Sequence, residues 1–352
     1  MKKVIEEIMI RANISIKEAL RKIDANRKGA LFVCDVDGVL LGALTDGDIR
    51  RRILGGGNLA DTVDCCYNHD PVFVVEGHYT IDEIKRLMLD KTVAIVPVID
   101  MNRCIIDILS WKDVFQDEAV TFKKIAVPVV IMAGGRGERL GPFTKILPKP
   151  LIPVGEKPII EIIIDKFSQH GVNEVYLTLN YKGEMIKNYL ESIEKNYQLR
   201  YIWEKDFLGT AGSLGLLPAD IGDTFMVSNC DIIVDVNYAD LLHFHRHNDN
   251  ILTVVGAFQN YKIPYGIINF ENEGKIKSIQ EKPEFDLTVN TGMYVLSHRA
   301  LTFIPENKPF DMTELVQVLL AVDENVGVYP VSQKSYGDVG QMEEYKKVIS
   351  QL

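Results

Sequence analysis

The chain has few cysteines, no long run of basic residues and no long apolar stretch, and each absence excludes a class of protein. The five cysteines among 352 residues form no CxxC pair, and Cys65 and Cys66 are neighbours, which suits neither a disulfide framework nor a zinc knuckle. The 39 basic residues are dispersed in a chain of net charge −10, so nucleic acid is not an expected partner. Glu6 and Glu7 stand where a secretory signal needs an apolar core, and no later stretch is long enough to span a bilayer. We therefore expect a cytoplasmic protein with reduced thiols and no membrane partner.

The composition is typical of a globular protein, and the length is sufficient for two domains. Hydrophobic residues make up 47% of the chain and charged residues 25%, which excludes a disordered or fibrous class. Two domains of a 352-residue chain can each bury a core of their own. The short polar stretch FQDEAVTFKKIAVP separates them, and we place a linker at 121–126 and the second domain at 127–352.

The first third of the chain contains an internal repeat. Residues 14–49 and 79–114 align at a constant offset of 65 without a gap. SIKEAL in the first copy matches TIDEIK in the second, and each is a capping box, in which a hydroxyl and a glutamate three residues later bind each other's amides. Each copy predicts a capped helix, a strand, a tight turn, a second strand and a helix, and the two copies should pack as a pair. We bound them at 1–58 and 59–120.

This repeat resembles the cystathionine-β-synthase-type (CBS) domain, whose tandem pairs bind adenosine nucleotides or mediate dimerisation. In that family a Thr/Ser-x-x-Asp element ends the second strand, with its hydroxyl near phosphate and its aspartate on ribose hydroxyls. The matching residues here are Thr45 with Asp48 and Ser110 with Asp113. Each pair is also a plain helix N-cap, so capping and ligand binding both remain open, and a capped helix start exposes amides that attract anions.

A loop rich in glycine and proline opens the second domain. Residues 132–151 read MAGGRGERLGPFTKILPKPL. A dinucleotide-binding fingerprint must run directly into a helix, which the four prolines from Pro142 to Pro153 forbid, and a P-loop needs a Gly-Lys-Ser/Thr that is missing. An extended loop remains, in which glycine amides can approach a phosphate while Arg139 and Lys149 supply positive charge.

The longer string GGRGERLGPFTKILPKPLIPVGEKPII resembles the signature of the sugar-1-phosphate nucleotidyltransferases, GGxGxRLxPxTxxxPKPLxPxxxKP. Later segments resemble that family in the right order over roughly residues 126–352. EKDFLGTAGSL resembles its base-recognition loop, and SNCDIIVD its strand ending in a metal-binding aspartate. IPYGIINF, IQEKPE and VNTGMYVLS resemble its sugar-binding segments, and YGDVGQMEEY its late Asp-x-Gly motif.

The resemblance implies an α/β fold, a Rossmann-like mixed sheet of the GT-A-like kind with helices on both faces, behind an α+β CBS pair. Helical stretches such as 157–169 alternate with apolar runs, in agreement with that fold. The apolar runs begin at Val127, Val175, Phe225, Ile251 and Val326.

In this family an oxygen of a sugar 1-phosphate attacks the α-phosphorus of a nucleoside triphosphate, and pyrophosphate leaves. The second ionisation of a phosphate monoester lies around pH 6, so no general base is required and the task of the protein is electrostatic. The resemblance implies that Arg139 contacts the leaving pyrophosphate, Lys149 bridges the phosphates, and Asp231 and Asp338 hold Mg²⁺. The implied nucleotide-binding residues are Gly134, Gly135, Gly137, Glu204, Gly209, Thr210 and Ala211, and the implied sugar-binding residues are Gly266, Glu281, Lys282, Asn290 and Thr291.

Two neighbouring sugar-binding candidates and a histidine cluster raise geometric questions. On an extended strand Glu281 and Lys282 would face opposite ways, so a local bend is expected there. The cluster HFHRHN places only His243 and His247 on one helical face, and we interpret it as amphipathic surface rather than a metal site.

The base-recognition loop, with GTAG and Glu204, resembles the guanylyltransferases, and HFHRHN together with the later sugar-binding segments resembles mannose-1-phosphate guanylyltransferases. Two residues depart from the pattern. Phe207 stands where that loop has proline, and Cys230 stands where glycine or serine precedes the metal-binding aspartate.

A CBS pair ahead of a nucleotidyltransferase resembles the enzymes that supply nucleotide-activated amino sugars to legionaminic acid-type pathways, where the product is GDP-glucosamine. GTP, glucosamine 1-phosphate and Mg²⁺ are therefore the expected substrates and cofactor, with an adenosine nucleotide at the CBS pair and a homo-oligomeric assembly. The alternatives are a UTP- or CTP-dependent enzyme of the same kind, and a nucleotide sensor that binds without turnover.

Overall fold

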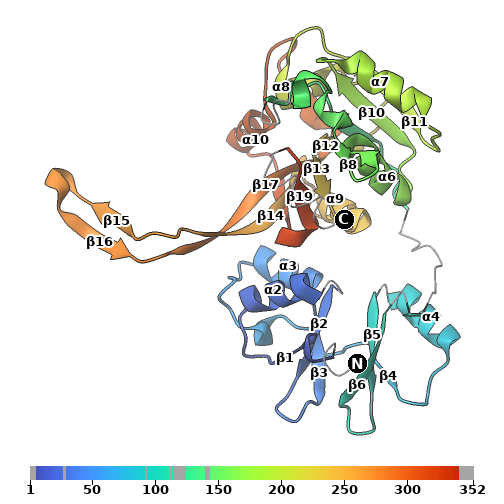
Figure 1. The fold of residues 1–352 in the computed structure, drawn as a ribbon, viewed down its shortest axis with the longest axis vertical. Helices are drawn as coiled ribbons and strands as arrows, with labels where there is room; N and C mark the ends of the chain where they lie inside the picture. Colours follow the sequence, from blue (N-terminus) through green and yellow to red (C-terminus); the bar gives the residue numbers. More distant parts are fainter. Residues whose placement is uncertain are drawn as a thin grey trace. The chain divides into compact units, whose positions relative to one another are not determined.

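The computed structural model describes residues 5–26, 29–91, 93–110, 113–114, 124–138 and 143–340. The chain divides into two compact units, Met1–Val120 and Thr121–Leu352, and Figure 1 traces the fold of each. Nowhere in the described ranges is a helix both long enough and apolar enough to cross a bilayer.

The first unit is built from two copies of one strand-helix-strand-strand pattern. The first copy consists of β1 (Met9–Ile10), α2 (Ile16–Asn26), β2 (Ala30–Cys34) and β3 (Leu40–Thr45), followed by α3 (Asp46–Leu54). The second consists of β4 (Val74–Val75), α4 (Ile81–Lys91), β5 (Ile95–Ile99) and β6 (Ile105–Ser110). Each element of the second copy begins 65 residues after its counterpart, which confirms the offset found in the sequence.

Hydrogen bonds cap the start of a helix in the second copy and join the two copies. The Thr80 amide donates to the Glu83 carboxylate at 2.8 Å, and the Glu83 amide donates to Thr80 Oγ1 at 3.3 Å, so the predicted capping box forms. The copies meet at their turns, where the Leu40 amide donates to the Arg103 carbonyl at 2.9 Å. The two copies therefore form a pair, as the sequence predicted.

A seven-stranded mixed sheet forms the centre of the second unit, in the order β11-β10-β7-β12-β17-β14-β18. The first four of these strands are parallel, and β17 runs antiparallel to both β12 and β14. The strands are β7 (Val129–Met132), β10 (Glu174–Leu179), β11 (Gln198–Trp203), β12 (Thr224–Asn229), β14 (Leu252–Lys262), β17 (Glu284–Ser297) and β18 (Val326–Val331). Every predicted apolar run lies on one of them, whereas β11 and β17 were not among the predicted runs.

Side chains alternate along the central strands between two separate cores. In β7, Val129 and Ile131 belong to one core, and Val130 and Met132 belong to the other. The first core is closed by α6 (Ile159–Gln169), α7 (Gly183–Ser192) and α9 (Tyr238–His247), and the second by α10 (Met312–Ala321) and a short 3-10 helix, η7 (His298–Phe303). The sheet is thus covered by helices on both faces, which confirms the predicted Rossmann-like architecture.

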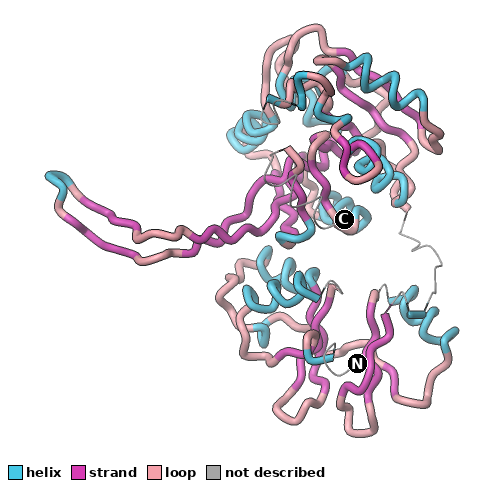
Figure 2. Tube along the Cα trace, in the orientation of Figure 1, coloured by secondary structure: helices cyan, strands magenta, loops and turns pink. Residues whose placement is uncertain are grey.

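Strands β14 and β17 continue beyond the sheet as a two-stranded ribbon. The ribbon leads into the hairpin of β15 (Ile267–Phe270) and β16 (Ile276–Gln280), which extends away from the rest of the unit (Figures 1 and 2). We call residues 258–288 the arm. The paired residues Ala257 and Val289 mark its base, because Ala257 is the last β14 residue that also pairs with β18.

A buried histidine in the second unit makes the stability of the fold depend on pH. His245 is 2% exposed, and its ring nitrogens lie 2.9 Å from Thr253 Oγ1 and 3.3 Å from Ser297 Oγ. Burial lowers the pKa of His245 to about 4, whereas an unfolded chain would titrate near 6.5. The unfolded state therefore binds the proton first, and stability should fall as the pH drops from about 6.5 toward 4.

We predict that urea unfolding at pH 7 and pH 5 will show His245→Asn to be less pH-sensitive than the wild type. The expected difference in pH dependence is about 2 kcal/mol, since one pKa unit corresponds to about 1.4 kcal/mol. Carboxyl groups titrate equally in both proteins and cancel in this comparison. Identical pH dependence in the two proteins would contradict the depressed pKa.

Candidate active site

The glycine loop leaves β7 with no regular secondary structure over residues 133–137 and lies between two other parts of the site. A β-carbon added at Gly134 would lie 2.6 Å from Glu204 Oε1, so this glycine lets the loop pass directly beside the base-recognition segment. Gly135 has open space where a side chain would stand. Gly137 has a φ of +66° and lies against the Lys149 side chain. The space at Gly135 leaves room for a ligand.

Lys149 and Asp231 form an ion pair from segments 82 residues apart. Lys149 begins a single 3-10 turn, η4 (Lys149–Leu151), which Pro148 and Pro150 define. Asp231 stands between β12 and the short strand β13 (Ile232–Val234). The two side chains are 17% and 16% exposed, so both charges are largely withdrawn from water yet open on one side.

The second predicted aspartate reaches the same place by strand pairing. Asp338 ends β19 (Tyr336–Asp338), which pairs antiparallel with β13 so that Asp338 stands opposite Ile232. The Val339 amide donates to the Asp231 carbonyl at 2.8 Å, and the Gly340 amide donates to Asp338 Oδ1 at 2.7 Å. Two aspartates 107 residues apart are thereby brought into one site.

Gly340 is the point at which the three charged groups converge. A β-carbon added there would lie 2.6 Å from Lys149 Nζ and 2.8 Å from Asp338 Oδ1, and closer still to the Asp231 carboxylate. Only glycine leaves this space open. Gly340 is the glycine of the Asp-x-Gly motif, of which the sequence analysis singled out only the aspartate, Asp338.

The two carboxylates fit a magnesium ion. Mg²⁺ prefers one or two carboxylates together with water and phosphate oxygens, and Asp231 and Asp338 offer that donor set on one side of Lys149. Among the residues that the structure describes, no group of three or more histidine, cysteine or acidic side chains is arranged to hold a metal by itself. A metal here would therefore share its coordination with the phosphates of a substrate.

Glu204 is anchored between the glycine loop and its own loop. Its amide donates to the Leu179 carbonyl at 2.9 Å, and its Oε2 accepts from the Leu208 amide at 3.3 Å. Asn180 Nδ2 donates to the Glu204 carbonyl at 3.0 Å, which ties the loop to the end of β10. Burial raises the pKa of the Glu204 carboxyl above its ordinary value.

The GTAG segment is fastened to the start of α10. Asp311 Oδ1 accepts from the Thr210 amide at 2.9 Å and from the Thr210 hydroxyl at 3.1 Å. The Ala211 amide donates to the Phe310 carbonyl at 2.9 Å, and Gly209 lies close against the same carbonyl. The amide and hydroxyl of Thr210 are therefore both used to fix the loop to Asp311. Asp311 is a positioning residue that the sequence analysis missed.

The two departures from the family pattern have different surroundings. The guanidinium of Arg136 lies 4.6 Å from the centroid of the Phe207 ring, so this phenylalanine links the base-recognition loop to the glycine loop. Cys230 is 7% exposed, and burial raises the pKa of its thiol to about 12, so it is an unreactive core side chain beside Asp231.

A lysine that the sequence analysis did not consider holds the proline-stiffened loop in place. Lys182 precedes α7, and its Nζ donates to the carbonyls of Thr144, Lys145 and Ile146 at 3.3, 2.7 and 2.9 Å. No local pattern could have indicated this contact, because its partners are main-chain atoms nearly forty residues earlier.

The structure divides the predicted sugar-binding residues into two groups. Gly266, Glu281 and Lys282 lie together on the arm, where Glu281 Oε2 is 2.9 Å from the position of a β-carbon at Gly266. Lys282 has a φ of +44° and its Nζ lies 3.8 Å from Glu281 Oε1, so the expected local bend is present. These three residues are not brought to the Lys149–Asp231 pair of their own chain.

The second group lies at the sheet. Asn290 Oδ1 accepts from the Gly292 amide at 2.9 Å, and its Nδ2 donates to the Tyr294 hydroxyl at 2.8 Å. Thr291 is 2% exposed and its hydroxyl donates to the Val255 carbonyl at 2.8 Å, at the irregular step where β14 changes register against β17. Arg139, the remaining catalytic candidate, lies outside the described residues.

The histidine cluster is divided as predicted. The rings of His243 and His247 stack at 5.7 Å between centroids on one face of α9, while His245 points into the fold.

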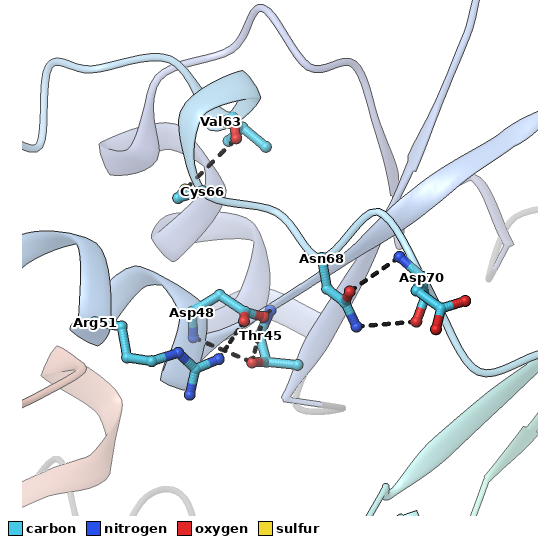
Figure 3. A network of polar contacts seen from close by, with 7 residues as sticks. All are labelled: Thr45, Asp48, Arg51, Val63, Cys66, Asn68 and Asp70. Atoms are coloured by element: carbon cyan, nitrogen blue, oxygen red, sulfur yellow. Dashed lines mark hydrogen bonds and ion pairs between the residues drawn. The ribbon is translucent and has the colours of Figure 1, made fainter.

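In the first unit the Thr/Ser-x-x-Asp pair at Thr45 forms the capping box of α3. Asp48 Oδ2 accepts from the Thr45 amide at 2.8 Å and from its hydroxyl at 2.7 Å, and Asp48 Oδ1 pairs with Arg51 (Figure 3). The Ser110 amide donates to Asp113 Oδ2 at 2.9 Å. The cap interpretation is therefore confirmed at Thr45 with Asp48, whereas the helix that would follow Ser110 lies mostly outside the described residues. Ligand binding stays a prediction at both pairs.

Comparison with known proteins agrees with this geometry. Residues 128–352 match the family model described as nucleotidyl transferase, and residues 1–55 and 65–118 match the CBS domain. A probable mannose-1-phosphate guanylyltransferase from Oryza sativa subsp. japonica is 33% identical over 226 residues, which cover 61% of this chain and 62% of that protein. A UTP–glucose-1-phosphate uridylyltransferase from Synechocystis is 27% identical over 241 residues, with 62% of each chain covered. The chain thus spans 62% of the length of these curated relatives.

A solved structure shares the fold of the second unit. HddC from Yersinia pseudotuberculosis has a TM-score of 0.52 and 25% identity, and the match covers 64% of this chain and 99% of that one. The family match covers well over half of the chain and includes the glycine loop, Lys149, Asp231 and Asp338. The chain therefore belongs to the nucleotidyl transferase family and carries two CBS domains ahead of the unit that matches this family.

Proposed function

We propose that this protein transfers a nucleoside monophosphate from a nucleoside triphosphate to a sugar 1-phosphate and releases pyrophosphate. The observation that carries the proposal is the convergence of the Lys149 ammonium with the Asp231 and Asp338 carboxylates around Gly340. A lysine and two carboxylates beside an open glycine loop suit a reaction in which two polyanions must be brought together.

The chemistry follows from the charges. An oxygen of the sugar phosphate, already anionic at neutral pH, forms a bond to the α-phosphorus while the bond to the β-phosphate oxygen breaks. Lys149 would contact the phosphates as a compact point charge, and amides of the glycine loop would bind the triphosphate. Arg139 is proposed to contact the departing pyrophosphate. A bound Mg²⁺, held by Asp231 and Asp338, would supply further neutralisation of the phosphate charge.

We propose GTP as the nucleotide. The Glu204 carboxylate is an acceptor held at the base-recognition loop, and guanine presents two adjacent donors, N1–H and N2–H, that one carboxylate can accept together. Uracil presents a single donor flanked by two carbonyl acceptors, which a carboxylate would repel. The guanylyltransferase relative at 33% identity supports this choice, and the uridylyltransferase relative keeps UTP as the alternative.

We propose glucosamine 1-phosphate as the sugar, because a CBS pair ahead of this catalytic domain resembles the enzymes of legionaminic acid-type pathways. Asn290 and Thr291 at the sheet, and Gly266, Glu281 and Lys282 on the arm, are the residues proposed to contact it. The proposal for the CBS pair is that it binds an adenosine nucleotide at Thr45 with Asp48, or at Ser110 with Asp113, and changes the catalytic rate.

The reaction is tested by pyrophosphate release in the presence of Mg²⁺, with GTP, UTP, CTP, ATP and dTTP each crossed against the 1-phosphates of glucosamine, N-acetylglucosamine, glucose and mannose. We expect GTP with glucosamine 1-phosphate to have the highest kcat/KM. Asp231→Asn should lose Mg²⁺-dependent turnover by orders of magnitude. If the folded protein releases no pyrophosphate with any of these substrate pairs, the alternative of a nucleotide sensor is supported instead.

Gly340→Ala tests the convergence itself. A methyl group there must displace Lys149 or one of the aspartates, so kcat/KM should fall by about 100-fold, the cost of a small misplacement in a preorganised site. Gly215→Ala is the matched control, because its added β-carbon would lie 3.6 Å from Ile304, an ordinary contact. Equal activity of the two variants would show that the space at Gly340 is not needed.

Calorimetry and steady-state kinetics with AMP, ADP and ATP test the CBS proposal. We expect Asp231→Asn, which should not turn over, to bind an adenosine nucleotide. Binding should be lost in Asp48→Asn or in Asp113→Asn, according to which pair is the site, because an asparagine oxygen still accepts from the Thr45 or Ser110 amide but lacks the charge. A rate that is unchanged over the titration, with no heat of binding, would leave the pair as a purely structural element.

A further inference from the structure

Each of the two paired segments of the arm, the ribbon at 258–262 with 284–288 and the hairpin at 267–270 with 276–280, has one polar face and one apolar face. In the ribbon next to the sheet, Lys262 lies 3.4 Å from Glu284, and Asn260 donates to Asp286 at 2.7 Å. In the terminal hairpin Asn269 donates to Ser278 Oγ at 3.1 Å. These cross-strand pairs satisfy the polar face within the arm itself.

The opposite face carries large apolar side chains in register. Tyr261 stands opposite Phe285 in the ribbon, and Ile268 stands opposite Ile279 in the hairpin. Because paired residues of antiparallel strands share a face, each apolar pair lies on the face away from the polar pairs next to it. This alternation is typical of a sheet of which one face is buried.

No part of the described chain covers this apolar face. The arm exposes eight large apolar side chains: Tyr265 74%, Phe270 70%, Ile279 62%, Ile276 56%, Ile268 53%, Tyr261 50%, Leu287 50% and Phe285 40%. At about 200 Å² for a large side chain, they expose on the order of 900 Å² of surface. A two-stranded ribbon is marginally stable by itself in water, so this face requires a partner.

The arm carries little net charge, which restricts the kind of partner. Its four lysines and five acidic residues leave a charge of −1, whereas the whole chain carries −10. Lys277 lies 3.5 Å from Glu271 and Lys282 lies 3.8 Å from Glu281, so much of that charge is paired within the arm. A nearly neutral arm does not attract a highly charged partner such as nucleic acid by its electrostatic potential. For the same reason, two copies of the arm can approach each other with little repulsion.

We infer that the arm is the dimerisation element of this protein and that its occupant is the arm of a second copy. Two apolar faces laid against each other form a two-layer ribbon, in which the same patch serves both chains as an isologous contact requires. The exposed area matches the roughly 800 Å² that each partner contributes to a stable interface. The dimer stands independently of the proposed reaction, because it rests on the arm alone.

Sedimentation velocity of the full chain at micromolar concentration tests the inference with two neighbouring substitutions. We expect the wild type to be a dimer. Ile279→Glu places a charge on the apolar face and should raise the dissociation constant by at least about 100-fold, since burying an unpaired carboxylate is costly. Ser278→Glu places the same charge on the polar face of the same strand and should leave the dimer intact.

Thermal melting and cross-linking complete the test. Both substitutions lie on exposed positions of β16 outside the two cores, so the melting temperature of the catalytic unit should not change. In a mixture of light and isotopically heavy chains, lysine cross-linking should join Lys275 or Lys277 of one chain to the arm of the other. A monomeric wild type, equal association of both variants, or cross-links from the arm only to its own chain would each overturn the inference.

Discussion

The contact between Lys149 and Asp231 is the interaction on which the site depends. It joins the proline-stiffened loop to the end of β12, and the pairing of β13 with β19 adds Asp338 to the same place. Each partner is held by a rigid element: a single 3-10 turn between prolines for the lysine, and paired strands for the aspartates. Charges held in this way need little reorganisation when a polyanionic substrate arrives, which is the condition for electrostatic catalysis.

The surrounding loops serve this arrangement by contacts between distant segments. Lys182 fastens the loop that carries Lys149, and Asp311 fastens the GTAG segment, while Arg136 and Phe207 connect the glycine loop to the base-recognition loop. These three contacts between distant segments therefore fix the loops on the nucleotide side of the site. The sugar side is different, because three of its five predicted residues lie on an arm with an uncovered apolar face. A dimer formed through the arms would fix the orientation of those residues, and assembly and sugar binding would then be linked.

Much of this structure could be read from local pattern. The offset of 65, the apolar runs of the central strands and the helix at 157–169 all follow from periodicity, and the structure has them at the expected places. The rejection of a dinucleotide-binding fingerprint also rested on a local rule, the exclusion of proline from helix interiors. The bend at Lys282 was expected because neighbouring residues of a strand cannot face the same way, and the positive φ there is the bend.

The sequence by itself determined the elements, the order of the motifs and the residue types that the chemistry needs, because hydrophobic period, caps and glycine positions act over a few residues. Only the tertiary structure decided that Gly340 is the point where Lys149, Asp231 and Asp338 meet, that Thr210 spends its polar groups on Asp311, and that Thr291 is buried at 2% exposure. It also decided that Gly266, Glu281 and Lys282 lie on a projecting arm. These are contacts between segments tens to hundreds of residues apart, and they are set by strand pairing and core packing, which no local pattern encodes.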